Sequence, residues 1–283
     1  MNKVWSEHRL ISFDETPIFY RHLRTNGPVR AVVILVHGMG EHGGRYQAFS
    51  DYLAELGIEC LVPDLRGFGK SGGKKACVKR FGDFHEDLDA LHSWASRHYT
   101  AVPIFLIGHS FGGLVVSSYL AFHKHPEIHG FVLSSPIFGV SIPVPFWRHL
   151  LGISVSYLCS HYTQSTRVEP RFLTHDPAIL EIYRQDPLIY HKISARLYRE
   201  LVKMVRRKTE IARRISASAL IVQAGEDKVV SKDETVKFFD ELKSKDKEIE
   251  IYADFYHEVL NETSRELVYS RIGRWLLERC SHK

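Results

Sequence analysis

One serine in this chain stands where a reactive hydroxyl would be exposed. Residues 108–112 read Gly-His-Ser-Phe-Gly, with an apolar, strand-like run before them and a helix-like run after them. A serine on a sharp strand-to-helix turn is typical of a nucleophile elbow. Glycines flank the serine in such a turn because larger side chains there would clash with the neighbouring elements. The helix N-terminus then points at the hydroxyl and favours negative charge there. The pattern predicts that Ser110 is a nucleophile, and an ordinary glycine-rich turn is the alternative.

A serine hydroxyl is a poor nucleophile at neutral pH, so it needs a base, and the base needs an orienting acid. With this kind of elbow the order along the chain is Ser, then Asp or Glu, then His. Asp227 follows a buried-strand pattern, and His257 follows an alternating one. Because sites in open parallel sheets form outside the carboxyl ends of the strands, we expect both side chains near Ser110. Glu226 and Asp254 are alternative acids, and we favour Asp227 because it lies deeper in its loop than Glu226.

A reaction at a carbonyl also needs backbone N–H groups that face the developing oxyanion. The apolar run at 31–36 ends in His-Gly-Met-Gly, where such a loop belongs. We expect the donors to be the N–H groups of Met39 and Phe111, the latter being the residue after the nucleophile. Gly38 and Gly40 let the loop approach a substrate closely. The histidine before them, His37, is predicted to order the loop by hydrogen bonds.

The same loop fits a competing motif. Glycines at 38, 40 and 43 match the dinucleotide fingerprint G-x-G-x-x-G, and Asp64 lies about twenty residues further on, as a ribose-binding acid would. A second match begins at Gly67. We disfavour this interpretation because His37 and the Glu-His pair at 41–42 crowd the turn. It also leaves the serine, aspartate and histidine above unexplained.

Strand-like and helix-like patterns alternate along the chain, which predicts an α/β fold with a mostly parallel sheet and helices on both faces. After a hairpin at 7–12 and 16–23, strands are expected near 31–36, 58–63, 103–107, 130–134, 218–224 and 248–253. Helices are expected near 45–56, 82–98, 111–124, 232–242 and 264–279. The alternation breaks at 137–215, which is too long for a simple connection. We predict an inserted helical cap there, over a core formed by 1–136 and 216–283.

The predicted cap has an apolar half and a basic half. Its apolar stretch, 143–158, either faces lipid or lines a tunnel for an acyl chain. The basic residues at 196–214 could attract an anionic head group or phosphate, but a solvated helix face is favoured. They are Arg196, Arg199, Lys203, Arg206, Arg207, Lys208, Arg213 and Arg214.

The composition is that of an ordinary globular protein, with 283 residues and a formal net charge of +5. This mild charge gives no reason to expect nucleic acid as a partner. The four scattered cysteines predict free thiols and no zinc site. No apolar signal segment is seen near the first residues, so we expect a cytoplasmic protein, with peripheral membrane contact through the cap as one option.

Four segments together resemble the monoacylglycerol lipase/lysophospholipase family of α/β-hydrolases. They are His-Gly-Met-Gly-Glu-His-Gly-Gly-Arg-Tyr at 37–46, Asp-Leu-Arg-Gly-Phe-Gly-Lys-Ser at 64–71, the elbow at 108–112, and His-Glu-Val-Leu-Asn-Glu at 257–262. The resemblance spans about residues 5 to 275. Two departures are Phe68, where relatives often carry His, and Met39, where a smaller residue is common.

This resemblance implies an α/β-hydrolase fold and places the nucleophile, acid, base and oxyanion donors at the positions given above. It implies a serine ester hydrolase that needs no cofactor or metal and acts on a single-chain lipid ester, with monoacylglycerol favoured. Alternatives are a lysophospholipase, a small-ester carboxylesterase, an acyltransferase, or a non-enzymatic ligand sensor with the same fold. The oligomeric state does not follow from the sequence.

Overall fold

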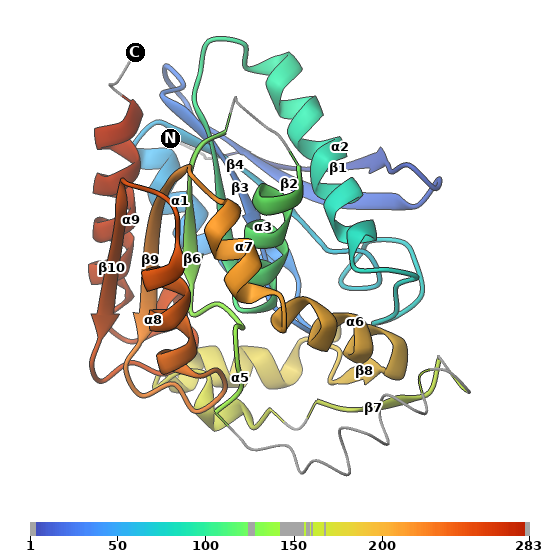
Figure 1. The fold of residues 1–283 in the computed structure, drawn as a ribbon. Helices are drawn as coiled ribbons and strands as arrows, with labels where there is room; N and C mark the ends of the chain where they lie inside the picture. The colour runs from blue at the N-terminus through green and yellow to red at the C-terminus, as the bar shows by residue number, and fades with distance from the viewer. Residues whose placement is uncertain are drawn as a thin grey trace.

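The computed structural model describes residues 4–123, 128–141, 156, 159, 161–166 and 168–280. Its centre is an eight-stranded sheet in the order β1-β2-β4-β3-β5-β6-β9-β10 (Figure 1). β1 and β4 each pair antiparallel with β2, and the other neighbouring strands pair in parallel. The strands are β1 Val4–Ile11, β2 Pro17–Arg24, β3 Ala31–Val36, β4 Ile58–Pro63, β5 Ile104–His109, β6 Ile128–Ser134, β9 Ser218–Ala224 and β10 Lys247–Tyr252.

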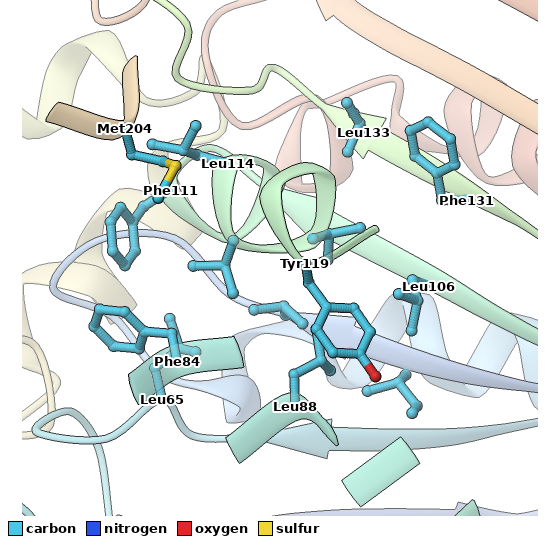
Figure 2. Close-up of a cluster of buried hydrophobic side chains, with 14 of the residues drawn as sticks. Leu65, Phe84, Leu88, Leu106, Phe111, Leu114, Tyr119, Phe131, Leu133 and Met204 are labelled. Carbon is cyan, nitrogen blue, oxygen red and sulfur yellow. The ribbon is translucent and has the colours of Figure 1, made fainter. Parts of the chain in front are cut away.

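Helices cover both faces of this sheet, so its central strands carry apolar side chains on both sides. In β3, Val32 and Ile34 join the core beneath α2, α3 and α8, whereas Val33 and Leu35 join the core beneath α1 and α9. Figure 2 shows part of the first core. The helices are α1 Gln47–Glu55, α2 Gly82–His98, α3 Phe111–Phe122, α8 Lys232–Glu241 and α9 Arg265–Cys280.

The segment between β6 and β9 holds further elements. Figure 1 shows α5, α6 and the β7–β8 pair beyond the end of the sheet toward which β9 and β10 point. Met204 of α6 lies beside Phe111 and Leu114 of α3 (Figure 2). The elements are β7 Thr163–Ser165, α5 Pro177–Gln185, β8 Lys192–Ser194, α6 Ala195–Val205 and α7 Lys208–Arg214. Except for Ser156, the apolar stretch predicted at 143–158 lies outside the described residues.

The fold class predicted from the sequence is confirmed. Each predicted strand and helix is present, with ends that differ by a few residues; the strand expected at 130–134, for example, begins at Ile128. The basic stretch near 194–214 forms two helices, α6 and α7. The division into core and cap stays a prediction, although α5 and α6 lie where a cap over the site would lie.

Candidate active site

Ser110 occupies a strained turn between β5 and α3. Its φ of 51° and ψ of −113° lie in a region that residues other than glycine rarely adopt. A Cβ on Gly108 would lie 2.5 Å from the carbonyl oxygen of Gly112, and a Cβ on Gly112 would lie closer still to that of Val36. The glycines therefore let β5, α3 and β3 approach closely enough to form the turn.

A hydrogen-bonded chain of three side chains begins at this serine. His257 Nε2 lies 3.0 Å from Ser110 Oγ, and His257 Nδ1 lies 2.8 Å from Asp227 Oδ2. All three residues are buried. When the Nδ1–H of the imidazole donates to Asp227, its Nε2 is left to accept the proton of the serine hydroxyl. The fold thus brings together three residues from the ends of three different strands.

The geometry also separates Asp227 from the alternative acids. Its second oxygen, Oδ1, accepts hydrogen bonds of 2.8 Å from the N–H groups of both Val229 and Val230, which fixes the carboxylate. Glu226 and Asp254 are exposed. Glu226 forms an ion pair with a lysine, not with the histidine.

The electrostatics of the pair match its geometry. Burial by itself lowers the pKa of His257, but the carboxylates of Asp227, Glu258 and Glu41 together outweigh burial, with Asp227 acting most strongly, and the pKa of His257 is raised above its ordinary value. Burial by itself raises the pKa of Asp227, but its contacts with His257 and two N–H groups lower it below its ordinary value. The acid therefore stays ionised near neutral pH and holds the imidazole in one tautomer.

The loop after β3 passes directly beside the serine. A Cβ on Gly38 would lie 3.3 Å from Ser110 Cβ and 2.9 Å from Glu41 Oε1, so a side chain there would force its neighbours to shift. Gly40 has a φ of +81°, which favours glycine, and the N–H of Tyr190 donates to its carbonyl at 2.7 Å. Phe111 is the first residue of α3, so its N–H has no partner within the helix.

His37 links this loop to its neighbours through both ring nitrogens. Its Nδ1 lies 2.7 Å from the Gly38 carbonyl oxygen, and its Nε2 accepts from the N–H of Leu65 at 2.8 Å. Burial lowers the pKa of His37, against the carboxylates nearby. In a planar trans peptide the C=O and the next N–H point in opposite directions. By holding the Gly38 carbonyl, His37 therefore also sets the direction of the Met39 N–H.

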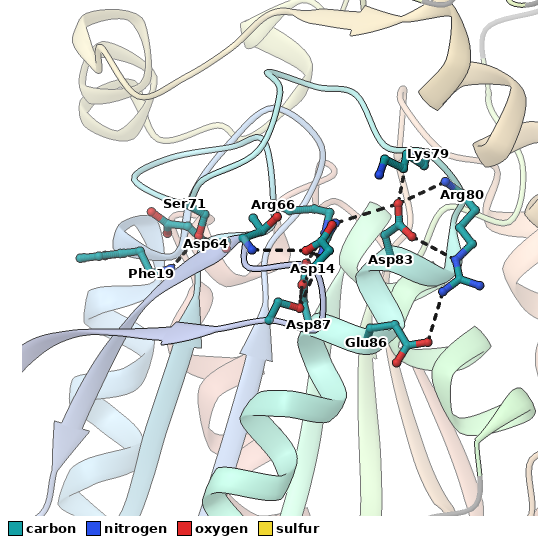
Figure 3. Close-up of polar contacts among 12 residues, drawn as sticks. Asp14, Phe19, Asp64, Arg66, Ser71, Lys79, Arg80, Asp83, Glu86 and Asp87 are labelled. Atoms are coloured by element: carbon teal, nitrogen blue, oxygen red, sulfur yellow. Dashed lines mark hydrogen bonds and ion pairs between the residues drawn. The ribbon is translucent and has the colours of Figure 1, made fainter.

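Asp64, the acid of the dinucleotide interpretation, is not available to a ribose. It is fully buried, and its Oδ1 accepts from Arg21 at 2.7 Å and from the N–H of Gly43 at 2.8 Å. Its Oδ2 accepts from the N–H of Lys70. Figure 3 shows Asp64 within this loop region, where Arg66 lies between Asp14 and Asp87. Asp64 therefore has a structural role in holding these loops together, which accounts for it without a bound dinucleotide.

Residues 27–264 match the protein family described as serine aminopeptidase, S33. The chain belongs to this family of α/β-hydrolases. Phospholipase YtpA of Bacillus subtilis is 30% identical over 84% of this hydrolase and 92% of its own length. The crystal structure of the monoacylglycerol lipase of Paleococcus ferrophilus is 29% identical, with a TM-score of 0.84 over 93% of this chain and 99% of that one.

One relative is much longer than this hydrolase. An uncharacterized abhydrolase domain-containing protein of Dictyostelium discoideum is 30% identical over 88% of this chain, which covers 26% of that protein. The resemblance inferred from the sequence motifs is confirmed by the family and its relatives. The predicted enzyme class, a carboxylic ester hydrolase, is confirmed with it.

The basic residues of α7, and Arg207 just before it, are paired with acidic side chains. Arg207 and Arg214 pair with Glu210, and Arg213 pairs with Glu241. Lys208 contacts an acidic residue of α8, Glu234. This arrangement favours the interpretation of a solvated helix face over that of a phosphate site.

The sequence reasoning missed several polar residues that the hydrolase buries around its site. Glu41, Arg45 and Glu258 form a cluster of charged side chains that are about 95% buried. The ring of His109 lies beside that of His257, tilted by 50° to it. The signal was present in the motifs at 37–46 and 257–262, but nothing in their spacing says that the two segments meet.

Two features are absent from the residues that the structure describes. Within them, no helix of the hydrolase is long and apolar enough to span a membrane. The same part of the chain holds no group of three or more His, Cys, Asp or Glu side chains placed to bind a metal ion.

Proposed function

We propose that this hydrolase cleaves single-chain lipid esters with Ser110 as nucleophile, His257 as base and Asp227 as the orienting acid. The observation that carries the proposal is the continuous hydrogen-bonded chain from Ser110 Oγ through His257 to Asp227, at 3.0 and 2.8 Å. These distances are within the reach that proton transfer requires. The elbow and the buried, ionised acid are the features that such a triad needs.

In the first step Ser110 Oγ attacks the ester carbonyl while its proton passes to His257 Nε2. The Asp227 carboxylate stabilises the imidazolium that results. The carbonyl oxygen takes the negative charge and accepts hydrogen bonds from the N–H groups of Met39 and Phe111. His257 then gives its proton to the leaving alcohol, and the acyl group remains on Ser110 as an ester.

The second step repeats the first with water. His257 takes a proton from water, the hydroxide attacks the acyl-serine carbonyl, and the same N–H groups face the oxyanion. The C–O bond to Ser110 breaks, the serine recovers the proton from His257, and a carboxylic acid leaves. Apart from the ester and water, the steps as written use only groups of this chain.

The favoured substrate is a monoacylglycerol, which would yield a fatty acid and glycerol. A relative of similar length is a monoacylglycerol lipase, and another is named a phospholipase. The second name keeps a lysophospholipase as the alternative. The acidic partners of Arg207, Arg213 and Arg214 favour the uncharged substrate, because a phosphate bound by these residues would have to displace them.

The remaining predictions belong to this proposal. A cap formed by 137–215 would admit one acyl chain. Its apolar stretch at 143–158, outside the described residues except for Ser156, would either line the tunnel for that chain or contact a membrane surface from the cytoplasmic side. A ligand sensor with the same fold is the non-enzymatic alternative. A sensor would turn over an ester once or not at all, whereas an enzyme turns over many times.

A labelling and turnover experiment tests the proposal. The wild-type chain is expected to react with a fluorophosphonate probe and to release fatty acid from monoolein over many cycles. The Ser110→Ala variant, purified in the same way and folded by circular dichroism, should do neither. Labelling of the variant, or its turnover at the wild-type rate, would place the nucleophile elsewhere.

A further inference from the structure

A buried arginine joins the two loops that carry the proposed catalytic groups. Arg45 Nη1 lies 2.6 Å from Glu41 Oε2 and 2.7 Å from Glu258 Oε1, and Arg45 Nη2 lies 2.7 Å from Glu258 Oε2. Its side chain is only 6% exposed. Arg45 and Glu258 are 213 residues apart in sequence, so these contacts hold together segments that nothing local connects.

On one side the arginine contacts the loop beside the nucleophile. Glu41 Oε1 accepts hydrogen bonds of 2.6 Å from both the N–H of Gly38 and the hydroxyl of Tyr46. Burial by itself raises the pKa of Glu41, but Arg45, together with His109, His37 and the Tyr46 hydroxyl, outweighs burial and lowers it to about 2. Glu41 is thus a fixed anion, and it holds the peptide immediately before the proposed oxyanion donor, Met39.

On the other side it contacts the loop of the base. Glu258 follows His257 directly, and the guanidinium binds its carboxylate in a two-point contact. Asn261 donates to the same carboxylate at 2.9 Å, and the N–H of Glu258 donates to the carbonyl of Leu173 at 2.8 Å. The backbone next to the imidazole is therefore fixed from several directions.

A third contact reaches the segment between β6 and β9. The Arg45 guanidinium lies over the ring of Tyr183 in α5, 4.9 Å from its centroid. The neighbouring His42 pairs with Asp186, just after this helix, at 2.7 Å. The Arg45 side chain thus contacts the oxyanion loop, the loop of His257 and α5.

We infer that Arg45 is a positioning residue, which sets the distance and orientation between the oxyanion loop and His257 by binding Glu41 and Glu258 at once. This inference rests on the function proposed above. A planar guanidinium can satisfy three carboxylate oxygens in fixed directions, whereas a lysine ammonium is a single point of charge. Arg45→Lys should therefore keep the charge and lose the geometry.

The test compares Arg45→Lys with Arg184→Lys, which makes the same exchange at a half-exposed arginine of α5. With p-nitrophenyl butyrate and with monoolein, Arg45→Lys is expected to lower kcat about ten- to a hundredfold, as small misplacements of catalytic groups do. KM should stay within about threefold, because the loss falls on the transition state. Fluorophosphonate labelling should slow by the same factor. Arg184→Lys should behave as wild type.

A second variant covers the case in which Arg45→Lys does not fold. Glu258→Gln keeps the shape of the side chain and its contact with Asn261 but removes the charge that Arg45 binds. Glu258→Gln should also lower kcat. In the double variant Arg45→Lys/Glu258→Gln, kcat should fall by a factor smaller than the product of the two single factors, because both substitutions remove the same contact.

Each outcome bears on the inference. A folded Arg45→Lys variant with kcat within about twofold of wild type would overturn it, as would a loss confined to KM. If Arg45→Lys does not fold, full kcat in Glu258→Gln overturns it. A wild-type chain that neither labels nor hydrolyses esters would instead refute the proposed function.

Discussion

The imidazole of His109 lies against that of His257, with the two ring centroids 4.9 Å apart. His109 is buried, and its Nδ1 lies 3.1 Å from Ser134 Oγ. Burial lowers its pKa to about 4, and the proximity of His257 acts in the same direction. The side chain of His109 is therefore a neutral imidazole near neutral pH, and it does not compete for protons with His257, the proposed base.

This lowered pKa predicts a loss of stability in mild acid. The unfolded chain binds a proton at His109 near pH 6.5, whereas the folded chain resists it down to about pH 4. Stability from this group is thus present above pH 6.5 and is lost as the pH falls. We expect the free energy of unfolding in urea to be lower at pH 5 than at pH 7, by about 2 kcal/mol from this group.

The variant His109→Gln isolates this contribution. It keeps a polar partner for Ser134 but has no titrating group, so the difference between pH 7 and pH 5 should shrink relative to wild type. His37 is also buried with a lowered pKa and adds a loss of the same sign in both proteins. An unchanged pH dependence in the variant would mean that His109 is charged or solvated in the folded chain.

The acid of the triad can be assigned by a pair of amide substitutions. Asp227→Asn should lower kcat roughly ten-thousand-fold, because the amide favours the wrong imidazole tautomer while the oxyanion donors remain. Glu226→Gln changes an exposed residue and should lower kcat only slightly. Steady-state kinetics on p-nitrophenyl butyrate with both variants would decide; the reverse order of losses would assign the role to Glu226.

The pH–rate profile tests the electrostatics of the same pair. His257 acts as a base only when neutral, and Asp227 raises its pKa above 6.5. For the wild-type enzyme kcat/KM should therefore rise with pH and reach half its plateau above pH 6.5. In Asp227→Asn the residual activity should reach half-plateau at a lower pH. A midpoint that does not move would mean that another group controls the acid limb.

Much of this site could be predicted because its chemistry lies at the ends of strongly patterned elements. The apolar runs ending at His109 and Ala224 predict buried strands, and parallel strands end on one edge of a sheet. Ser110 comes directly after the first run, and Asp227 is the third residue after the second. Their meeting with His257 therefore follows from the α/β pattern and from the order of the residues along the chain.

The supporting contacts could not be predicted in this way. That Arg45 meets Glu258 depends on how two distant loops approach, and neither residue type marks a buried position, since arginine and glutamate are usually exposed. The hydrogen bond from the Tyr190 N–H to the carbonyl of Gly40 is a backbone contact and leaves no trace in side-chain pattern. Tertiary contacts of both kinds are seen only in coordinates.

The last prediction concerns the charge of the substrate. If the basic residues of α6 and its C-cap, Arg206, form a solvated face, neutralising the exposed ones should leave substrate preference unchanged. Lys203→Gln with Arg206→Gln is the suitable pair, because both residues are exposed and neither lies in the catalytic chain. We expect kcat/KM for monoolein and for oleoyl lysophosphatidylcholine to stay within about twofold of wild type.

The predicted cap can be tested with triolein, a third substrate that carries the same acyl chain as monoolein. A pocket that closes over one acyl chain excludes a bulky substrate sterically, although it distinguishes chains that differ by one methylene only weakly, by about 1–3 kcal/mol. Monoolein should therefore be cleaved much faster than triolein. If the paired substitution lowers turnover of the lysophospholipid alone, the basic face binds phosphate and the enzyme is better described as a lysophospholipase. Equal cleavage of triolein would instead contradict a cap over Ser110.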